Sequence, residues 1–318
     1  MFRSVKGLKP FFWRRTIKNT RRDIFSSSKI AAQKYAGFAL TRFAVPVWSN
    51  YNKGGTVLSI KSDLASEIID GISEENLPKK RFHRFGGVDI TEIEIAPGKM
   101  EELFSRPAGK YITMEAESIL DPTKDGDGEI AALAAELSSL LPKKGTVLAV
   151  GIGNEELAAD SLGAKAIGMM TAGSFLGRRL CCLSTGVCGK TGFSPPEMIS
   201  SVIAMTKPAA LILIDALAAE DISHIGKTVQ LTNGGICPGS GAGRERFELS
   251  EKTLGVPAVC VGLPTVAAFP APAEKNPLLV APCGIDVTVK RGARLIALAA
   301  ELAVFPALGL DVIKELSY

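Results

Sequence analysis

The chain has 318 residues, of which 46% are apolar and 22% are charged. This length can form one large α/β domain, or two smaller ones, with a fully buried core. Because no run of about 18 uncharged apolar residues occurs, we expect no membrane-spanning helix and no membrane partner. The six cysteines include no C-x-x-C pair, so neither a disulfide framework nor a metal or other cofactor is indicated.

The net charge of +4 arises from the first part of the chain. Residues 1–55 contain 12 Lys and Arg and one acidic residue, Asp23, whereas the remainder holds 25 basic and 32 acidic residues. We therefore predict a basic leader over residues 1–56, either disordered or lying before the true start, and a single α/β domain over 57–318. The leader has the Arg-rich, acid-poor composition of an organellar transit peptide.

Two other interpretations of the leader stay open. The segment "NKGGTVL" (52–58) is readily encoded by a ribosome-binding sequence followed by a GTG start codon at Val57, so translation can begin there, and the N-terminal residue of the native protein decides this. Alternatively, the leader binds nucleic acid, in which case removal of residues 1–56 should abolish binding. The acidic remainder of the chain predicts no direct nucleic-acid contact.

The predicted elements after the leader alternate between short apolar strands and helices. Strands are predicted over 87–96 and 109–119, a helix over 127–141, a buried strand over 143–154 and a helix over 157–170. The later segments are a Cys- and Gly-rich loop (181–192), a helix with proline in its first turn (194–206), three strands (one within 209–219 that ends at the carboxylate Asp215, then 228–233 and 256–266) and a final helix (289–305). This alternation favours a doubly wound, mainly parallel sheet with helices on both faces.

Two glycine-rich segments resemble phosphate-binding loops but lack an essential residue. "GIGNEE" (151–156) has Glu156 where the dinucleotide fingerprint needs its last glycine, and a carboxylate there would repel a pyrophosphate. "STGVCGKT" (184–191) has Ser184 in place of the first glycine of a phosphate loop. Nucleotide binding is therefore not expected.

Asp160 and Asp215 are the strongest candidates for catalytic groups. Each follows a hydrophobic strand, and ligands bind at the carboxyl ends of strands in such sheets. Burial behind four branched apolar residues should raise the pKa of Asp215, and a nearby carboxylate should raise it further. Two such groups can share a proton, so that the ionised one activates water and the neutral one donates a proton. The alternative is that both aspartates only cap helices.

Six segments in a fixed order connect the chain with a known family. They are "SDLASE", "PAGKYITMEAESI", "AVGIGNEELAADSLGA", "KPAALILIDALAA", "GGICPGSGAGRERFELSEKTLGVPAVCVGLPTV" and "GIDVTV", and they span roughly residues 62–290. In these segments the chain resembles the germination proteases of spore-forming bacteria, endopeptidases that degrade small acid-soluble spore proteins. The resemblance implies an aspartic-type endopeptidase with Asp160 and Asp215 as its catalytic pair and no cofactor.

The same resemblance implies further properties. The α/β peptidase domain is expected to have a phosphorylase/hydrolase-like fold, similar to that of the hydrogenase-maturation peptidases. The protein is expected to be a homotetramer that is made as a zymogen in the cytoplasm of the forespore and spore core. It is expected to process its own N-terminus and to act on small acid-soluble spore proteins during germination.

The segment "DLASE" (63–67) resembles the sequence at which the family's substrates are cut, an acid and an apolar residue followed by Ala-Ser-Glu. We predict that it is the self-processing site, cleaved between Asp63 and Leu64. The alternative is a helix start, with Ser62 or Asp63 as the cap. If translation begins at Val57, the segment removed has only seven residues.

A glycine-rich segment forms a second predicted functional region. Gly239, Gly241 and Gly243 would allow the backbone to approach a bound chain or a neighbouring subunit, and Arg244 could pair with a carboxylate. We therefore predict a substrate-binding or structural loop, with a plain mobile loop as the alternative.

The chain departs from the family at three charged positions. Glu155 and Glu156 stand where the family commonly has aromatic and amide residues, and Lys190 stands where it tends to be uncharged. These carboxylates leave open a metallopeptidase of the hydrogenase-maturation type, with Glu156 and Asp160 as metal ligands and His224 as the third. A chelator would inhibit that enzyme and leave an aspartic-type enzyme active.

Overall fold

The computed structural model describes residues 62–69, 78–238, 247–269 and 278–317. These residues belong to the compact unit Leu40–Tyr318, one of two into which the chain divides. The predicted leader and its boundary at residue 56 lie outside the described residues, as does the predicted glycine loop with Gly239, Gly241, Gly243 and Arg244.

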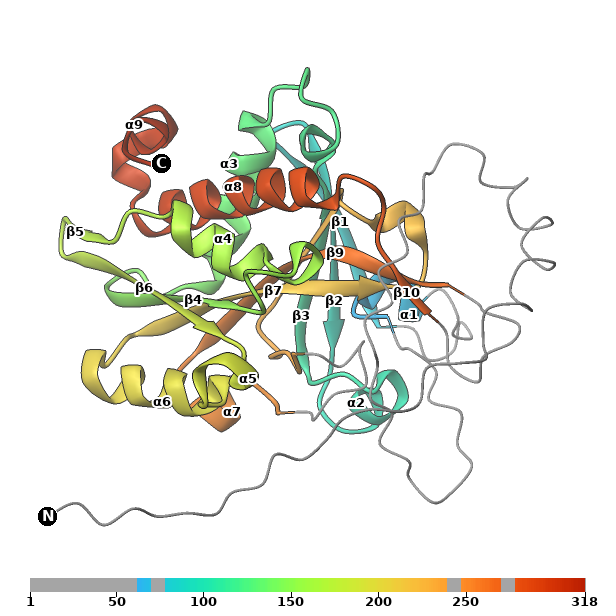
Figure 1. Cartoon of the computed structure of the whole chain (residues 1–318), viewed down its shortest axis with the longest axis horizontal. Coiled ribbons are helices and arrows are strands. Elements are labelled where there is room, and N and C mark those ends of the chain that lie inside the picture. The colour runs from blue at the N-terminus through green and yellow to red at the C-terminus, as the bar shows by residue number, and fades with distance from the viewer. Residues whose placement is uncertain (1–61, 70–77, 239–246, 270–277, 318) are drawn as a thin grey trace, which may run out of the picture. The chain divides into compact units, whose positions relative to one another are not determined.

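The described residues form one ten-stranded sheet in the order β1-β2-β3-β8-β9-β7-β4-β6-β5, with β10 paired to β9 (Figure 1). The strands are β1 (Lys79–Phe85), β2 (Val88–Ile95), β3 (Gly109–Glu115), β4 (Gly145–Ile152), β5 (Gly173–Phe175), β6 (Arg178–Gly186), β7 (Ala210–Ala219), β8 (Thr228–Thr232), β9 (Ala258–Phe269) and β10 (Leu278–Val280). The central strands β6, β4, β7 and β9 are parallel. Antiparallel strands extend the sheet, with β8, β3, β2 and β1 beyond β9 and β5 beyond β6.

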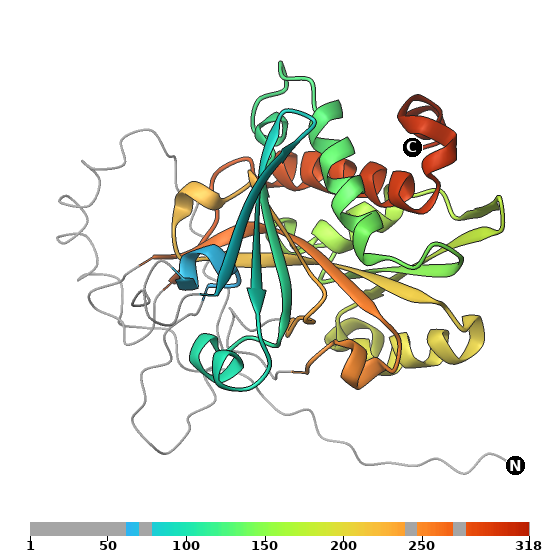
Figure 2. The same cartoon turned by 180° about the vertical axis from the view of Figure 1, so that it is seen from behind.

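Helices cover both faces of this sheet. They are α1 (Ala65–Ile69), α2 (Lys99–Phe104), α3 (Asp127–Leu140), α4 (Leu162–Met169), α5 (Cys188–Thr191), α6 (Pro195–Thr206), α7 (Glu251–Leu254), α8 (Ile285–Val304) and α9 (Gly309–Leu316). The larger core cluster joins α3, α4 and α8 to one face, and a second cluster joins α6 and α7 to the other (Figure 2). The predicted α/β class, with a parallel centre and helices on both faces, is confirmed.

None of the described helices is by itself long and apolar enough to cross a membrane. Only α8 and α9 taken together pass this test, and they are bent by 96° at the break between them. Most of α8 is buried against the sheet and its neighbouring helices.

Two local predictions are wrong. The predicted loop over 181–192 is largely strand β6, in which Cys181 and Cys182 pair in parallel with β4, followed by the short helix α5. Cysteine behaves as a small apolar residue and is compatible with such a strand. Asp215 does not end its strand either, because β7 continues to Ala219 alongside the long neighbour β9.

A close backbone contact fixes α4 on the sheet. At Gly163 in α4, a Cβ atom would lie 2.4 Å from Ile152 N and 2.5 Å from Ile214 O. At Gly151 in β4, a Cβ atom would lie 2.2 Å from Gly163 O. Because both positions are glycine, the first turn of α4 rests directly on β4 and β7. The residues just before α4 therefore reach the part of β7 that follows Ile214.

Substitution of Gly163 by Ala should separate α4 from the sheet. The added Cβ meets rigid backbone, so Gly163→Ala is expected to lower the free energy of unfolding by about 3 kcal/mol, measured by urea denaturation. Gly168→Ala, in the same helix, is the matched control because nothing lies within 4 Å of its added Cβ. The control should be neutral or stabilising by up to about 1 kcal/mol. Equal effects of the two substitutions would contradict the role of the contact.

Candidate active site

Asp215 lies inside the sheet with only 6% of its surface exposed. Its Oδ1 accepts a hydrogen bond from Ala216 N at 2.9 Å. Burial raises the pKa of Asp215 well above its ordinary value, and the negative charges of Asp160 and Asp63 raise it further. The expected rise of the Asp215 pKa from burial and a second carboxylate is thus confirmed, and the neutral form of this carboxyl group is favoured.

Asp160 is held near Asp215 by backbone contacts. It ends the 3₁₀ turn η3 (Ala158–Asp160), directly before α4, and its Oδ2 accepts a hydrogen bond from Asn154 N at 3.0 Å. Gly153, with φ +106°, makes room for this turn, since a Cβ there would lie 2.2 Å from Asp160 O. Thr265 on β9 donates from Oγ1 to Ala159 O at 2.6 Å and fixes the turn from the other side.

Neither aspartate is a helix cap. Asp215 lies within β7, and the N-cap position of α4 is Ser161. The structure therefore rejects the capping alternative and brings the two carboxyl groups close enough for the Asp160 charge to act on Asp215.

The predicted self-processing segment is bound at the same end of β7. Asp63 N donates to Ala218 O at 2.8 Å, and Ala218 N donates to Asp63 Oδ2 at 2.9 Å. Leu64 is fully buried in an apolar cluster with Leu217 and Ala219. The next residue, Ala65, begins helix α1. The helix-start interpretation and the predicted position of the cleavage site are therefore compatible.

Two side chains that the sequence did not indicate hold the backbone around the Asp63–Leu64 bond. Gln230 Nε2 donates to Asp63 O at 2.8 Å, and Gln230 Oε1 accepts from Ala65 N at 2.7 Å. Arg106 donates to Ser62 O and lies 3.5 Å from the Asp63 carboxylate. Gln230 lies in β8 (Thr228–Thr232), whose five residues are all buried, but neither this burial nor the role of Arg106 is marked in the sequence.

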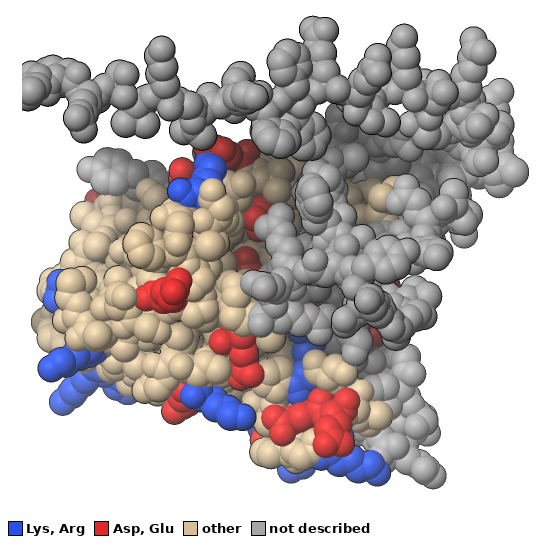
Figure 3. Space-filling model, turned by 60° about the horizontal axis from the view of Figure 1, so that its bottom comes forward, with Lys and Arg blue, Asp and Glu red and all other residues tan. Residues whose placement is uncertain are grey.

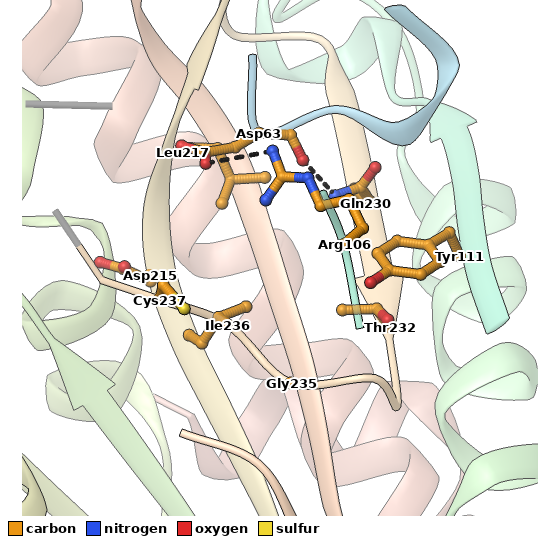
Figure 4. A pocket seen from close by; sticks show the side chains of 10 residues that line it. All are labelled: Asp63, Arg106, Tyr111, Asp215, Leu217, Gln230, Thr232, Gly235, Ile236 and Cys237. Atoms are coloured by element: carbon orange, nitrogen blue, oxygen red, sulfur yellow. Dashed lines mark hydrogen bonds and ion pairs between the residues drawn. The ribbon is translucent and has the colours of Figure 1, made fainter. Parts of the chain in front are cut away.

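A small pocket of about 30 Å³ lies between Asp215 and the bound segment (Figure 4). Its lining residues are Asp63, Arg106, Tyr111, Asp215, Leu217, Gln230, Thr232, Gly235, Ile236 and Cys237. A cavity of this size, with several polar groups, can hold a water molecule. Asp215 on β7 and Asp63 of the bound segment line this same small cavity.

Two of the charged departures from the family neutralise each other. Lys190 at α5 forms an ion pair with Glu156, which follows the glycine turn after β4. On the described part of the face in Figure 3, acidic and basic side chains are interspersed over a mostly uncharged surface. That part of the face shows no extended basic patch of the kind that binds nucleic-acid backbones.

The metal-dependent alternative requires Glu156, Asp160 and His224 in one place, and the structure does not bring them together. His224 Nδ1 shares a hydrogen bond with Thr228 Oγ1 at 2.9 Å, and its Nε2 lies 3.8 Å from a Glu67 carboxylate oxygen. Within the described ranges, no three His, Cys, Asp or Glu side chains are grouped so as to hold a metal ion. The described residues do not fit a metal centre.

The described residues form an α/β domain in which two neighbouring carboxyl groups, Asp160 and Asp215, lie on or beside the parallel strands of the sheet. The family profile described as "Germination protease" matches residues 61–276, and the chain belongs to this family. It is therefore a hydrolase, a protease associated with spore germination.

Two curated relatives agree with this assignment, and one solved structure shows a weaker likeness. The germination protease of Caldanaerobacter subterraneus subsp. tengcongensis is 33% identical over 226 residues, which are 66% of this chain and 70% of that protein. The germination protease of Clostridium acetobutylicum is 35% identical over 230 residues, 65% of this chain and 70% of that protein. The NiFe hydrogenase maturation protease HycI of Thermococcus kodakarensis is similar with a TM-score of 0.35 and 18% identity, over 52% of this chain and 99% of that one.

Substitution of Asp215 by Asn should remove a pH dependence of stability. The pKa of Asp215 is raised in the folded state, so the folded chain binds more protons than the unfolded one, and stability is lost as the pH rises above about 4. Asp215→Asn should therefore gain stability over the wild type as the pH rises from about 4 towards the raised pKa of the folded state, by about 1.4 kcal/mol for each unit by which folding raises that pKa. Urea unfolding between about pH 4 and pH 8 measures this. Asp89→Asn, at a side chain that is 84% exposed, is the control, and identical pH profiles for Asp215→Asn and wild type would contradict the burial argument.

Thr265 should act as a positioning residue for Asp160. Thr265→Val leaves Ala159 O without its donor, and we expect a loss of about 1–2 kcal/mol in stability and about tenfold in kcat with little change in KM. Thr265→Ser should restore both. Thr113→Val is the matched control, because Thr113 Oγ1 is buried and has no hydrogen-bond partner among the described residues. A normal kcat in Thr265→Val would contradict this role.

Proposed function

We propose that the protein is a self-processing, aspartic-type endopeptidase that degrades small acid-soluble spore proteins during germination. One observation supports this best. Asp63, at the predicted cleavage position, lines the same pocket as the buried Asp215, and the charge of Asp160 acts on the Asp215 carboxyl group. The resemblance of "DLASE" to the family's substrate sequence supports the proposed substrates and the cleavage position.

The two carboxyl groups have distinct roles in the proposed mechanism. Asp215 is the neutral member, because burial and neighbouring negative charge favour its protonated form. Asp160 is the ionised member, and its carboxylate accepts the hydrogen bond from Asn154 N. Asp160 takes a proton from water as the water oxygen attacks the Asp63 carbonyl carbon. Asp215 then gives its proton to the leaving nitrogen of Leu64, and the C–N bond breaks.

Gln230 supplies a hydrogen-bond donor to the carbonyl oxygen that becomes negatively charged during attack. Its Nε2 donates to Asp63 O, which is the carbonyl oxygen of the bond proposed to be cut. Negative charge develops on this oxygen during attack, and an already aligned donor stabilises that charge. Arg106 helps to hold the chain one residue earlier, at Ser62 O.

We also propose that the enzyme is a homotetramer and that it is made as a zymogen in the cytoplasm of the forespore and spore core. Both properties follow from the family resemblance. The bound segment is consistent with a zymogen, because Leu64 and Asp63 cover the pocket beside Asp215 that a substrate would need to enter.

Asp160→Asn and Asp215→Asn are each expected to slow peptide hydrolysis by about 1,000-fold, because each removes one of the two proton-transfer groups. The substrate is a peptide containing Glu-Ile-Ala-Ser-Glu, and mass spectrometry also follows self-processing. The wild type should yield a new N-terminus at Leu64, and both variants should remain uncut. Asp89→Asn serves as the folded, exposed-carboxylate control.

The same assay is run with and without a chelator. Full activity in either aspartate variant would refute the aspartate pair, and inhibition by the chelator would point to a metal-dependent enzyme. A new N-terminus at another residue would refute the proposed cleavage position but not the pair.

A further inference from the structure

The second acidic residue of "DLASE", Glu67, is bound by backbone amides just after the end of β7, and these contacts are called the Glu67 pocket below. The Glu67 side chain is only 9% exposed. Its two carboxylate oxygens accept hydrogen bonds from Glu220 N at 2.9 Å and from Asp221 N at 2.7 Å. A pair of backbone N–H groups that converge on one carboxylate forms an anion-binding site.

His224 completes this pocket and is itself fixed in place. Its Nε2 lies 3.8 Å from Glu67 Oε1, while its Nδ1 bonds with Thr228 Oγ1 on β8. The turn that carries both amides is also braced, because the Asp221 side chain accepts from Ser223 N at 2.8 Å. The groups around the Glu67 carboxylate are therefore two backbone N–H donors and an imidazole. Such groups bind a carboxylate well.

The spacing between this pocket and the proposed cleavage point is set by independent contacts. Gln230 holds Asp63 O and Ala65 N, and Leu64 fills the apolar site made by Leu217 and Ala219. The chain then turns into α1, and this turn carries the fourth residue after the Asp63–Leu64 bond to the two amides. The bound segment is thus contacted at three places: Gln230 binds its backbone, the Leu217 and Ala219 site holds an apolar side chain, and the two amides bind an acidic side chain.

We propose that the amides of Glu220 and Asp221, with His224, form a specificity site for an acidic side chain four residues after the cleaved bond of a protein substrate. The chain's own Glu67 occupies this site as a substrate side chain would. The inference deepens the proposed function and rests on cleavage between Asp63 and Leu64. After that cleavage, Leu64 to Glu67 stay attached through α1, so a substrate must displace them.

Binding is tested in a full-length double variant. Asp215→Asn stops the chemistry, and Leu64→Asp places a charge at a fully buried position, which should release the chain's own segment. Two fluorescent peptides that contain Asp-Leu-Ala-Ser-Glu or Asp-Leu-Ala-Ser-Gln are compared by anisotropy. The Glu peptide should bind about tenfold or more tightly than the Gln peptide, because it forms charge-assisted hydrogen bonds. Without Leu64→Asp, both peptides should bind more weakly.

The histidine contribution is measured in the same background. His224→Ala should reduce the Glu-to-Gln preference by about threefold or more. His83→Ala, at the other histidine, should leave the preference unchanged, because His83 lies on β1 and contacts Glu136. A His224→Ala variant with unchanged preference would overturn the role of His224.

Equal affinity for the two peptides, or no binding of either, would overturn the site as a whole. The proposed function has a separate outcome. If the Glu preference holds but the wild type cuts neither peptide, the endopeptidase mechanism fails while the acidic-residue site stands. If the wild type cuts both peptides with the same kcat/KM, the mechanism stands and the specificity site fails.

Discussion

The backbone of α4 rests directly on the backbones of β4 and β7, where Gly163 meets Ile152 and Ile214. Any side chain at Gly163 would push the helix away from the sheet. Because η3 directly precedes α4, this contact also determines where Asp160 lies. The electrostatic effect of Asp160 on Asp215 therefore depends on the close contact between Gly163, three residues after Asp160, and Ile214, the residue before Asp215.

Burial raises the pKa of Asp215, and for the same reason the ionised form of Asp215 destabilises the folded chain at high pH. A carboxyl group within a parallel strand is removed from water, so its charged form is disfavoured. In the proposed mechanism this raised pKa keeps a proton on Asp215 for the leaving nitrogen. The close packing around Gly163 and Gly262 maintains the burial of Asp215.

In the proposed function, the bound Asp63–Glu67 segment links self-processing to the choice of substrate. In the proposed mechanism the same contacts that hold this segment in the uncut chain would hold a substrate. Residues 63–67 would then compete with a substrate for these contacts. Cleavage would weaken this competition but not remove it, because Leu64 to Glu67 stay attached through α1. Under this proposal, Gln230 would bind the backbone of a substrate, the Leu64 site an apolar side chain and the Glu67 pocket an acidic side chain.

The sequence by itself was enough to predict the α/β class, to select Asp160 and Asp215 as candidate catalytic groups and to select "DLASE" as a candidate cleavage segment. These features are local: strand and helix periodicity, a carboxylate after an apolar run, and a short motif. Only the tertiary structure revealed Gln230, Arg106, Thr265 and the Glu67 pocket, because each acts through residues far away in the sequence. Gln230, for example, contacts Ala65 across 165 positions. Strand β6 and the continuation of β7 were missed for the same reason, since neighbouring strands β4 and β9 stabilise them and their own residue patterns do not indicate them.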